Sequence, residues 1–255
     1  GVVFCMGPYN YPLNETFTTL IPALIMGNTA VLKPPRHGVL LYRLLLRAFQ
    51  ESFPPGVVNT IYGEGSKIAG PLMASGKVDV LAFIGSSRVA DALKAQHPKP
   101  HRLRCVLGLD AKNAAIILPD ADLDRTVTEC LLGSLSYNGQ RCTALKILFV
   151  HEALREAFLE KLAAAVSALP CGLPWEDGVK ITPLPTLKQV AYMRELLDDA
   201  AAHGGAVVNP GGGQANGTLM CPAVVCPVTP DARLYREEQF GPIVPICPFT
   251  DLDEP

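Results

Sequence analysis

The stretch Val80-Leu81-Ala82-Phe83-Ile84-Gly85-Ser86-Ser87 decides the fold class. A short apolar strand runs directly into a glycine turn, and a helical pattern follows from Arg88 to Gln96. The same succession of strand and helix repeats over the first 109 residues. Because such alternation is typical of a parallel sheet with helices on both faces, we predict a doubly wound α/β fold.

The elements of this first region are short and closely spaced. The predicted strands are Val2–Cys5, Ala30–Leu32, Val57–Ile61, Val80–Ile84 and Cys105–Leu107, and the predicted helices are Thr16–Met26, Val39–Phe49, Ser66–Ala74 and Arg88–Gln96. Ligands bind such sheets at the carboxyl ends of the strands. Side chains that directly follow a strand are therefore the first candidates for a binding site.

A second α/β domain is predicted from residue 113 to residue 255, after a first domain of residues 1 to 112. Its predicted elements are the strand Ala114–Leu118, a helix from Asp122 to Tyr137 with Asp120 or Asp122 as N-cap, the strand Ile147–Val150, and the amphipathic helices His151–Leu169 and Thr186–His203. These assignments follow the apolar periodicity and the helix start signals.

Cys142 is the candidate nucleophile of this second domain. It lies in Tyr137-Asn138-Gly139-Gln140-Arg141-Cys142-Thr143-Ala144, a short loop between a helix and a buried strand, where a rigid scaffold can hold a reactive side chain. The neighbouring Arg141 favours the thiolate, which is the nucleophilic form of cysteine. The alternative is that Cys142 is a small buried hydrophobic residue, as free cysteines more often are.

Composition excludes several classes of protein. The chain of 255 residues is 49% hydrophobic and 18% charged, which is enough to form a substantial core. A net charge of −2 does not indicate binding to nucleic acid or to an anionic membrane surface. No apolar run reaches the ~18 residues of a membrane span, and no signal peptide pattern is present.

The eight cysteines show no C-x-x-C and no spacing suited to zinc. A core of this size does not need disulfides, so we interpret the cysteines as reduced thiols and expect a cytoplasmic protein. His97 and His101 flank a proline-rich loop without a neighbouring thiol or carboxylate. We therefore predict no metal site.

Five short motifs resemble those of the aldehyde dehydrogenase superfamily, in the same order and at similar spacing. They are Gly7-Pro8-Tyr9-Asn10-Tyr11-Pro12, Leu32-Lys33-Pro34-Pro35, Phe83-Ile84-Gly85-Ser86-Ser87, Gly139-Gln140-Arg141-Cys142-Thr143-Ala144 and Glu237-Glu238-Gln239-Phe240-Gly241-Pro242. Each motif is weak by itself, but together they extend over essentially the whole chain. The resemblance implies a Rossmann-like cofactor domain followed by an α/β catalytic domain, and NAD(P)-dependent oxidation of an aldehyde.

The resemblance also implies a set of cofactor residues. They are Lys33, Arg36, Gly85, Ser86, Glu238 and Phe240. Independently of the family, the turn at Gly85 offers backbone N–H groups and a helix dipole to a phosphate, although such turns are more often only N-caps. Lys33 is alternatively a solvated strand end, and Glu238 an ordinary solvated carboxylate. Two cations at Lys33 and Arg36 favour NADP over NAD, because guanidinium suits a 2′-phosphate.

By resemblance, the Asn10 amide joins the Cys142 backbone N–H in an oxyanion hole, while Tyr11, Arg141 and Thr143 lie at the substrate. Asn10 beside a proline is alternatively only a turn residue. The Cys142 motif, Asn10-Tyr11-Pro12 and Lys180-Ile181-Thr182-Pro183 look most like the non-phosphorylating, NADP-dependent glyceraldehyde-3-phosphate dehydrogenases. In those enzymes the counterpart of Arg141 binds the substrate phosphate.

One motif departs from the family pattern. Most members read E-L-G-G-K where this chain has Gly108-Leu109-Asp110-Ala111-Lys112, so Gly108 replaces the glutamate that activates the deacylating water. Asp110 lies two residues on and shares a face with that position in extended chain, so it is a candidate replacement base. Alternatively, Asp110 is a turn residue, and the thioester passes to coenzyme A or the protein is a silent scaffold.

The chain begins within a predicted strand, and family members have a long segment before this point and an oligomerisation strand beyond the last motif. We therefore expect the chain to be the middle portion of a longer protein. The resemblance implies a homo-oligomer when that protein is complete. The expected partner is a small aldehyde substrate.

Overall fold

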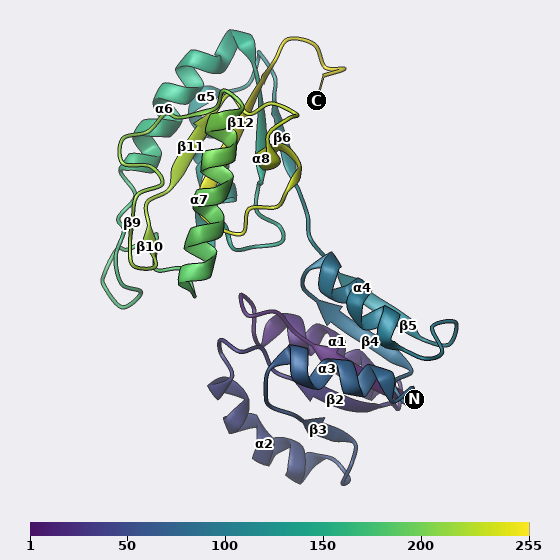
Figure 1. Ribbon diagram of the computed structural model, residues 1–255. Coiled ribbons are helices and arrows are strands. Elements are labelled where there is room, and N and C mark those ends of the chain that lie inside the picture. Colours follow the sequence, from purple (N-terminus) through teal and green to yellow (C-terminus); the bar gives the residue numbers. More distant parts are fainter. Residues whose placement is uncertain (255) are drawn as a thin grey trace. The chain divides into compact units, whose positions relative to one another are not determined.

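Two compact units make up the chain, Gly1–Asp110 and Ala111–Pro255, in the computed structural model, which describes residues 1–254 (Figure 1). Each unit is built on its own five-stranded sheet with helices packed against it. The predicted division between residues 112 and 113 lies two residues beyond the boundary of the first unit. The α/β fold class predicted from the strand and helix pattern is confirmed.

The first unit has a fully parallel sheet in the order β3-β2-β1-β4-β5. Its elements in chain order are β1 (Val2–Met6), α1 (Asn14–Ile25), β2 (Thr29–Lys33), α2 (Leu40–Ser52), β3 (Val58–Thr60), α3 (Gly65–Ala74), β4 (Val80–Ile84), α4 (Ser87–Gln96) and β5 (Arg104–Gly108). The strand order reverses direction between β1 and β4. In open α/β sheets, ligands bind beyond the carboxyl ends of the strands at such a reversal.

Every strand and helix predicted for this unit is present, with bounds that differ by up to three residues. The strand β4 has the predicted bounds, because Gly85 ends its apolar run sharply. Strand β2 is longer than predicted and includes Thr29 and Lys33. Those two polar residues pair with β1, so the ladder extends beyond the apolar pattern that indicated it.

Helices cover both faces of the first sheet, because successive side chains of β1 are apolar and point alternately to the two faces. Phe4 and Met6 pack in one cluster, whose buried members from α3 and α4 are Ala69, Met73, Ala90 and Leu93. Val3 and Cys5 pack in the opposite cluster, whose buried members from α1 and α2 are Leu20, Ala23 and Tyr42. Successive side chains of a strand point to opposite faces, so the central strand β1 is buried on both sides, whereas the edge strand β5 is largely exposed.

The second unit has the sheet order β6-β7-β12-β11-β8, in which only β8 is antiparallel to its neighbour among the described residues. Its elements are β6 (Ala114–Ile117), α5 (Leu123–Leu135), the 3₁₀ turn η1 (Ser136–Gly139), β7 (Ile147–His151), η2 (Glu152–Leu154), α6 (Arg155–Ser167), α7 (Leu187–Ala202), β8 (Ala206–Val207), β9 (Ala215–Asn216), β10 (Leu219–Met220), β11 (Ala223–Cys226), α8 (Arg233–Arg236) and β12 (Ile243–Phe249). Strands β9 and β10 form a separate hairpin.

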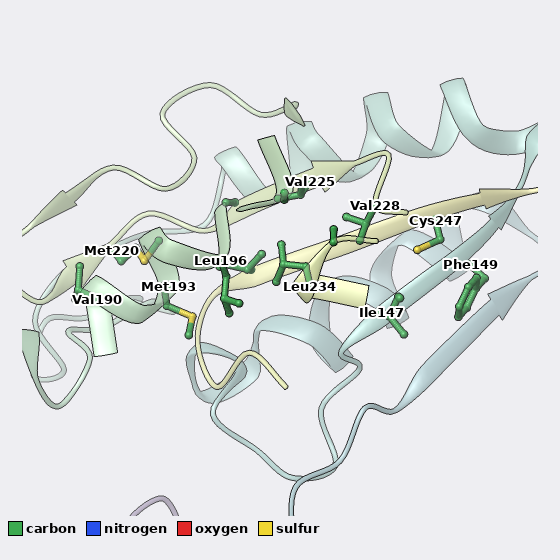
Figure 2. Close-up of a cluster of buried hydrophobic side chains, with 14 of the residues drawn as sticks. Ile147, Phe149, Val190, Met193, Leu196, Met220, Val225, Val228, Leu234 and Cys247 are labelled. Carbon is green, nitrogen blue, oxygen red and sulfur yellow. The ribbon is translucent and has the colours of Figure 1, made fainter. Parts of the chain in front are cut away.

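Two apolar layers sandwich the second sheet. Figure 2 shows the layer in which α7 packs on β7, β11 and β12, with Met193, Leu196, Val225 and Cys247 among its buried members. Helices α5 and α6 form the layer on the other face, which contains Phe158. Strand β12 contributes to both layers, so it lies at the centre of the core.

Two predicted helix bounds in the second unit are corrected. Helix α5 ends at Leu135 rather than Tyr137, because the backbone of Tyr137 is left-handed and cannot continue a right-handed helix. His151 belongs to β7, and α6 starts only at Arg155. Of the two proposed N-caps of α5, Asp122 is the one used, since its carboxylate accepts a hydrogen bond from the Arg125 N–H at 3.1 Å.

None of the helices formed by residues 1–254 is both long enough and apolar enough to cross a membrane.

Candidate functional site

Four predicted site residues of the first unit follow parallel strands at the same edge of its sheet. Asn10 follows β1, Lys33 is the last residue of β2, Gly85 follows β4, and Asp110 follows β5. Because all these strands run in the same direction, their carboxyl ends meet at one edge. The sheet thus brings together residues that are up to 100 positions apart in the sequence. Its strands are all short and have similar lengths, at ~3.3 Å per residue, so their ends lie at about the same level.

Lys33 is buried at this edge and is not the solvated strand end of the alternative interpretation. Its side chain and backbone together are 8% exposed, and its ammonium donates a hydrogen bond to the carbonyl of Pro34 at 3.0 Å. Burial lowers the pKa of Lys33 below its usual value. Arg36, three residues later, is exposed. One cation is therefore buried at the end of β2, and the other is exposed.

The segment that carries Asn10 and Tyr11 is anchored at its end. The Pro12 carbonyl accepts hydrogen bonds from the Thr16 hydroxyl at 2.9 Å and from the Tyr42 hydroxyl. Thr16 and Tyr42 are both fully buried. Helices α1 and α2 therefore fix the chain immediately after Asn10 and Tyr11, as a preorganised polar turn requires.

The turn after β4 already holds one carboxylate. The Gly85 N–H donates to the Gly108 carbonyl at 3.0 Å, and the Ser87 N–H donates to the Asp110 carboxylate at 2.7 Å. Ser86 is the N-cap of α4, but its hydroxyl makes no capping hydrogen bond. Asp110 is thus placed at the positive end of the α4 dipole, which is a structural role that the sequence did not indicate.

The cysteine loop of the second unit begins with three consecutive residues of positive φ, Tyr137 (55°), Asn138 (58°) and Gly139 (70°). Asn138 is buried, and its amide group exchanges hydrogen bonds with the backbone of Thr182 at 2.9 Å in both directions. Thr182 belongs to the Lys180–Pro183 segment, which is one of the motifs quoted above. The left-handed strain is thereby held by a buried side chain.

Gly139 is the position where the loop touches the last motif. A Cβ atom there would lie 2.6 Å from the Gly241 carbonyl oxygen and 2.9 Å from the Ser134 carbonyl oxygen. Both distances are far below a normal contact, and both neighbours are backbone atoms. Glycine is required here for a close approach of two backbone segments as well as for its φ.

Cys142 is half-buried, and its peptide is held by Asn113. The Asn113 amide donates to the Cys142 carbonyl at 2.6 Å and to the Ala144 carbonyl at 3.0 Å. Asn113 directly precedes β6, so the edge of the second sheet fixes the backbone on either side of Thr143. A nucleophile needs this kind of fixed backbone together with a partly accessible thiol.

Arg141 is held on the other side of the cysteine. Its guanidinium donates to the Ser136 hydroxyl and to the Thr143 hydroxyl, the latter at 3.4 Å. Among the residues that the structure describes, none accepts a hydrogen bond from its buried Nε. Arg141 is therefore a cation whose side chain is held in place by two hydroxyl groups.

Lys146 joins the cysteine loop to the Glu238–Phe240 segment. Its ammonium donates to the Gly139 carbonyl at 2.6 Å and to the Gln239 carbonyl at 3.0 Å, and it lies 3.6 Å from a Glu238 carboxylate oxygen. It also lies 4.7 Å from the centroid of the Phe240 ring. Burial lowers the pKa of Lys146 to about 8, and the Glu238 carboxylate opposes this shift.

A second lysine and a glutamine complete this connection. The Lys112 ammonium donates to the Glu237 carbonyl at 2.9 Å and to the Gln239 side-chain carbonyl at 2.6 Å. The Gln239 amide donates to the carbonyls of Lys146 at 2.7 Å and Ile243 at 3.0 Å. Burial and the charge of Lys146 lower the pKa of Lys112 to about 7. The predicted residues Glu238 and Phe240 thus flank a buried, fully bonded glutamine.

The second unit therefore brings together Cys142, Arg141, Thr143, Glu238 and Phe240. Sequence reasoning missed Asn113, Lys146, Lys112 and Gln239. For Lys146 a signal was present, because it stands directly before the buried run Ile147–Val150, and a lysine is rarely buried without partners. For the other three, no pattern in the sequence identified the partner.

Metal ligands do not cluster in the described chain, where no group of three or more His, Cys, Asp or Glu side chains could hold an ion. His97 is buried and structural. Its two ring nitrogens contact the Val78 carbonyl at 3.0 Å and the Lys99 N–H at 3.1 Å. Each of the eight cysteines, all within residues 1–254, is a free thiol.

This combination of a doubly wound parallel sheet and a cysteine loop packed on an E-x-F-G-P segment defines a class of enzyme. The chain belongs to the aldehyde dehydrogenase family, whose model matches residues 1–255. The resemblance inferred from the five motifs is thereby confirmed.

Within this family, similar proteins include NADP-dependent glyceraldehyde-3-phosphate dehydrogenases. That of Streptococcus equinus is 38% identical over 258 residues, and that of Pisum sativum is 34% identical over 255 residues. Each alignment includes the whole chain, but only 52% and 50% of the relative. The solved structure of the Bacillus halodurans C-125 enzyme complexed with NADP matches with a TM-score of 0.91 and 34% identity, over 100% of this chain and 52% of that one. The chain spans about half the length of these relatives.

We predict that Gly139→Ala lowers the free energy of unfolding by about 3 kcal/mol or more. The added methyl group would collide with two backbone carbonyls, and the alanine would have to adopt a strained positive φ. The matched control is Gly178→Ala, since Gly178 has a similar φ of 78° but a Cβ atom there would have no neighbour within 4 Å. That variant loses only about 1 kcal/mol. Urea denaturation measures both, and equal losses would contradict the close-approach argument.

Proposed function

We propose that this chain carries the nucleophile and the cofactor-binding elements of an NADP-dependent aldehyde dehydrogenase. The observation that carries the proposal is the cysteine loop, whose backbone is fixed by Asn113 on one side and by Lys146 on the other. A structural cysteine would not need a loop of left-handed residues that is bonded on both sides. Strain of this kind is found where a reactive group must be held in one orientation.

In the proposed reaction, the Cys142 thiolate adds to the aldehyde carbon, and the carbonyl oxygen becomes an alkoxide. The Cys142 backbone N–H is one proposed donor to that alkoxide, and the Asn10 amide is the other. Bound NADP would supply the acceptor for the hydride of this carbon, which leaves an acyl thioester on Cys142. Water then attacks the thioester carbon, the thiolate leaves, and the carboxylic acid is released.

NADP is preferred in this proposal because of the cations at the end of β2. Lys33 is buried with its ammonium bonded to a backbone carbonyl, and the exposed Arg36 adds a planar fork suited to a 2′-phosphate. Gly85 and Ser86 are proposed to receive the pyrophosphate at the start of α4, where the Ser86 hydroxyl makes no capping bond. Glu238 is proposed to bind the nicotinamide ribose, and Phe240 to pack beside the nicotinamide.

Glyceraldehyde 3-phosphate is the proposed substrate. Arg141 is anchored by Ser136 and Thr143, and its planar cationic fork is suited to a phosphate. Tyr11 and Thr143 are proposed to line the same substrate. The relatives from Streptococcus equinus and Pisum sativum, which carry this substrate in their names, support the choice.

The eight free thiols are compatible with a reducing compartment, so we propose a cytoplasmic location. A homo-oligomer stays a prediction of the resemblance.

We predict that Cys142→Ser in the full-length protein abolishes the burst of reduced cofactor, because the hydroxyl of serine is a far weaker nucleophile than a thiolate. Stopped-flow absorbance at the reduced nicotinamide band measures the burst. The control is Cys171→Ser, which changes an exposed cysteine of the same unit and leaves the burst intact. An undiminished burst in Cys142→Ser would exclude Cys142 as the nucleophile.

Arg36→Ala tests the cofactor preference. If Arg36 contacts the 2′-phosphate, losing a hydrogen bond to a charged group costs about 2 kcal/mol, which raises the KM for NADP roughly 30-fold and leaves the KM for NAD unchanged. Arg43→Ala removes another exposed arginine of the same unit and serves as the control. A KM for NADP that stays the same in Arg36→Ala, or a wild-type preference for NAD, contradicts this part of the proposal.

Asp110 is the proposed base for the deacylating water, and its contact with Ser87 supplies the competing structural role. Asn at this position keeps a side-chain oxygen that can accept the Ser87 N–H but cannot take a proton. Asp110→Asn therefore separates capping from base catalysis, whereas Asp110→Ala removes both. Loss of the base slows hydrolysis of the thioester, which follows the burst, and leaves the burst itself unchanged.

We predict that Asp110→Asn gives a normal burst followed by turnover slowed by about 10²–10⁴-fold, the usual value of general-base catalysis. Single-turnover and steady-state kinetics measure the two phases. If steady-state hydrolysis is unchanged in Asp110→Asn, Asp110 is a capping residue only. Turnover restored by added coenzyme A, with an acyl-coenzyme A product, would instead favour the acyl-transfer alternative that Gly108 leaves open.

A further inference from the structure

One buried ammonium contacts both halves of the proposed site in the second unit. Lys146 is 1% exposed, and it is the only lysine among the largest fully buried side chains of residues 1–254. Its Nζ donates hydrogen bonds to the carbonyls of Gly139 and Gln239 and lies 3.6 Å from a carboxylate oxygen of Glu238, an ion-pair distance. An ammonium has three donors, so two are used by the carbonyls and one is left for the Glu238 carboxylate.

The positions of those acceptors are not arbitrary. Gly139 lies three residues before Cys142, while Glu238 and Gln239 are consecutive, and the Phe240 ring faces the same ammonium. Burying an ammonium costs several kcal/mol unless its partners are well placed. An apolar residue at position 146 would avoid that cost but would take a donor from the carbonyls of Gly139 and Gln239 and from the Glu238 carboxylate. The charge is therefore tied to groups of the proposed site.

The backbone at Lys146 is joined to the Glu237–Gln239 segment without the help of this ammonium. Gln239 already bonds the Lys146 carbonyl at 2.7 Å and the Ile243 carbonyl at 3.0 Å, and Lys112 bonds the carbonyl of Glu237. What the Lys146 ammonium adds is contact with the Glu238 carboxylate, the Phe240 ring and the Gly139 carbonyl. These are the groups whose orientation matters for cofactor and nucleophile.

We propose that Lys146 is a positioning residue, which sets the orientation of the Glu238 carboxylate and at the same time holds the loop that carries Cys142. This inference rests on the proposed function, because it takes Glu238 as a cofactor ligand and Cys142 as the nucleophile. It assigns no proton transfer to Lys146. The lysine acts through Glu238 on cofactor binding and through Gly139 on the accessibility of the thiol.

A double-mutant cycle tests the part that acts through Glu238. The variants are Lys146→Met, which keeps the apolar stem, Glu238→Gln, and the double variant, and the measured quantity is the dissociation constant of NADP in calorimetry. Each single variant weakens NADP binding about tenfold, and the double variant also weakens it about tenfold rather than a hundredfold, because both remove the same interaction. Multiplicative losses, or no loss in Lys146→Met, overturn the proposal.

The part that acts through Gly139 is tested by alkylation of Cys142 with iodoacetamide, followed by peptide mass spectrometry. Lys146→Met changes the labelling rate of Cys142, while Glu238→Gln leaves it close to wild type, because only the lysine bonds the Gly139 carbonyl. Lys161→Met is the control, since Lys161 is an exposed lysine of the same unit paired with Asp124 at 2.7 Å. A labelling rate in Lys146→Met equal to that of wild type overturns the proposal.

The two experiments also separate this inference from the proposed function. If the wild-type protein does not bind NADP, the proposed function fails and the labelling rate alone decides the role of Lys146. If Lys146→Met does not fold, as judged by circular dichroism, Lys146→Gln replaces it throughout. That side chain is one atom shorter than lysine and uncharged, so it loses the ion pair with Glu238 and the lysine's reach to the Gly139 carbonyl, and the same outcomes are expected.

Discussion

The second unit depends on the satisfaction of one buried charge. The Lys146 ammonium sits in the core, where an isolated charge is costly, and three oxygen atoms from two distant segments converge on it. This requirement keeps the chain around Gly139 next to the chain around Gln239. The close approach of Gly139 to the Gly241 carbonyl belongs to the same arrangement, while the left-handed loop is held by the bonds between Asn138 and Thr182.

The first unit depends on a different constraint, the common direction of its five strands. A parallel sheet with its order reversed between β1 and β4 places every strand's carboxyl end at one edge, where Lys33, Gly85 and Asp110 collect. At this edge the Asp110 carboxylate bonds the Ser87 N–H. Asp110, the proposed base, is thus also bonded to the turn proposed to receive a phosphate. The same carboxylate would have to accept a proton from water and a hydrogen bond from the Ser87 N–H.

Sequence patterns predicted the elements well and their ends less well. Strand β4 was predicted with its bounds, because an apolar run ends at a glycine, whereas α5 ends two residues before the predicted Tyr137. Helical periodicity reports which face is buried, but it does not report a left-handed backbone. That conformation of Tyr137 and Asn138 is held by a hydrogen bond from Asn138 to Thr182, which is 44 residues away. Local patterns carry no information about such a partner.

The sequence by itself determined the fold class, the order of the motifs and the family, because the strand and helix periods and the short motifs are local properties. It also marked Cys142, Lys33 and Glu238 as candidates by residue type and position. Only the tertiary structure decided that Lys33 is buried, that Asp110 caps α4, and that Lys146 and Asn113 hold the cysteine loop. Each of these depends on partners brought together by sheet packing, and a hydrogen bond is fixed by distance in space, whatever the separation in sequence.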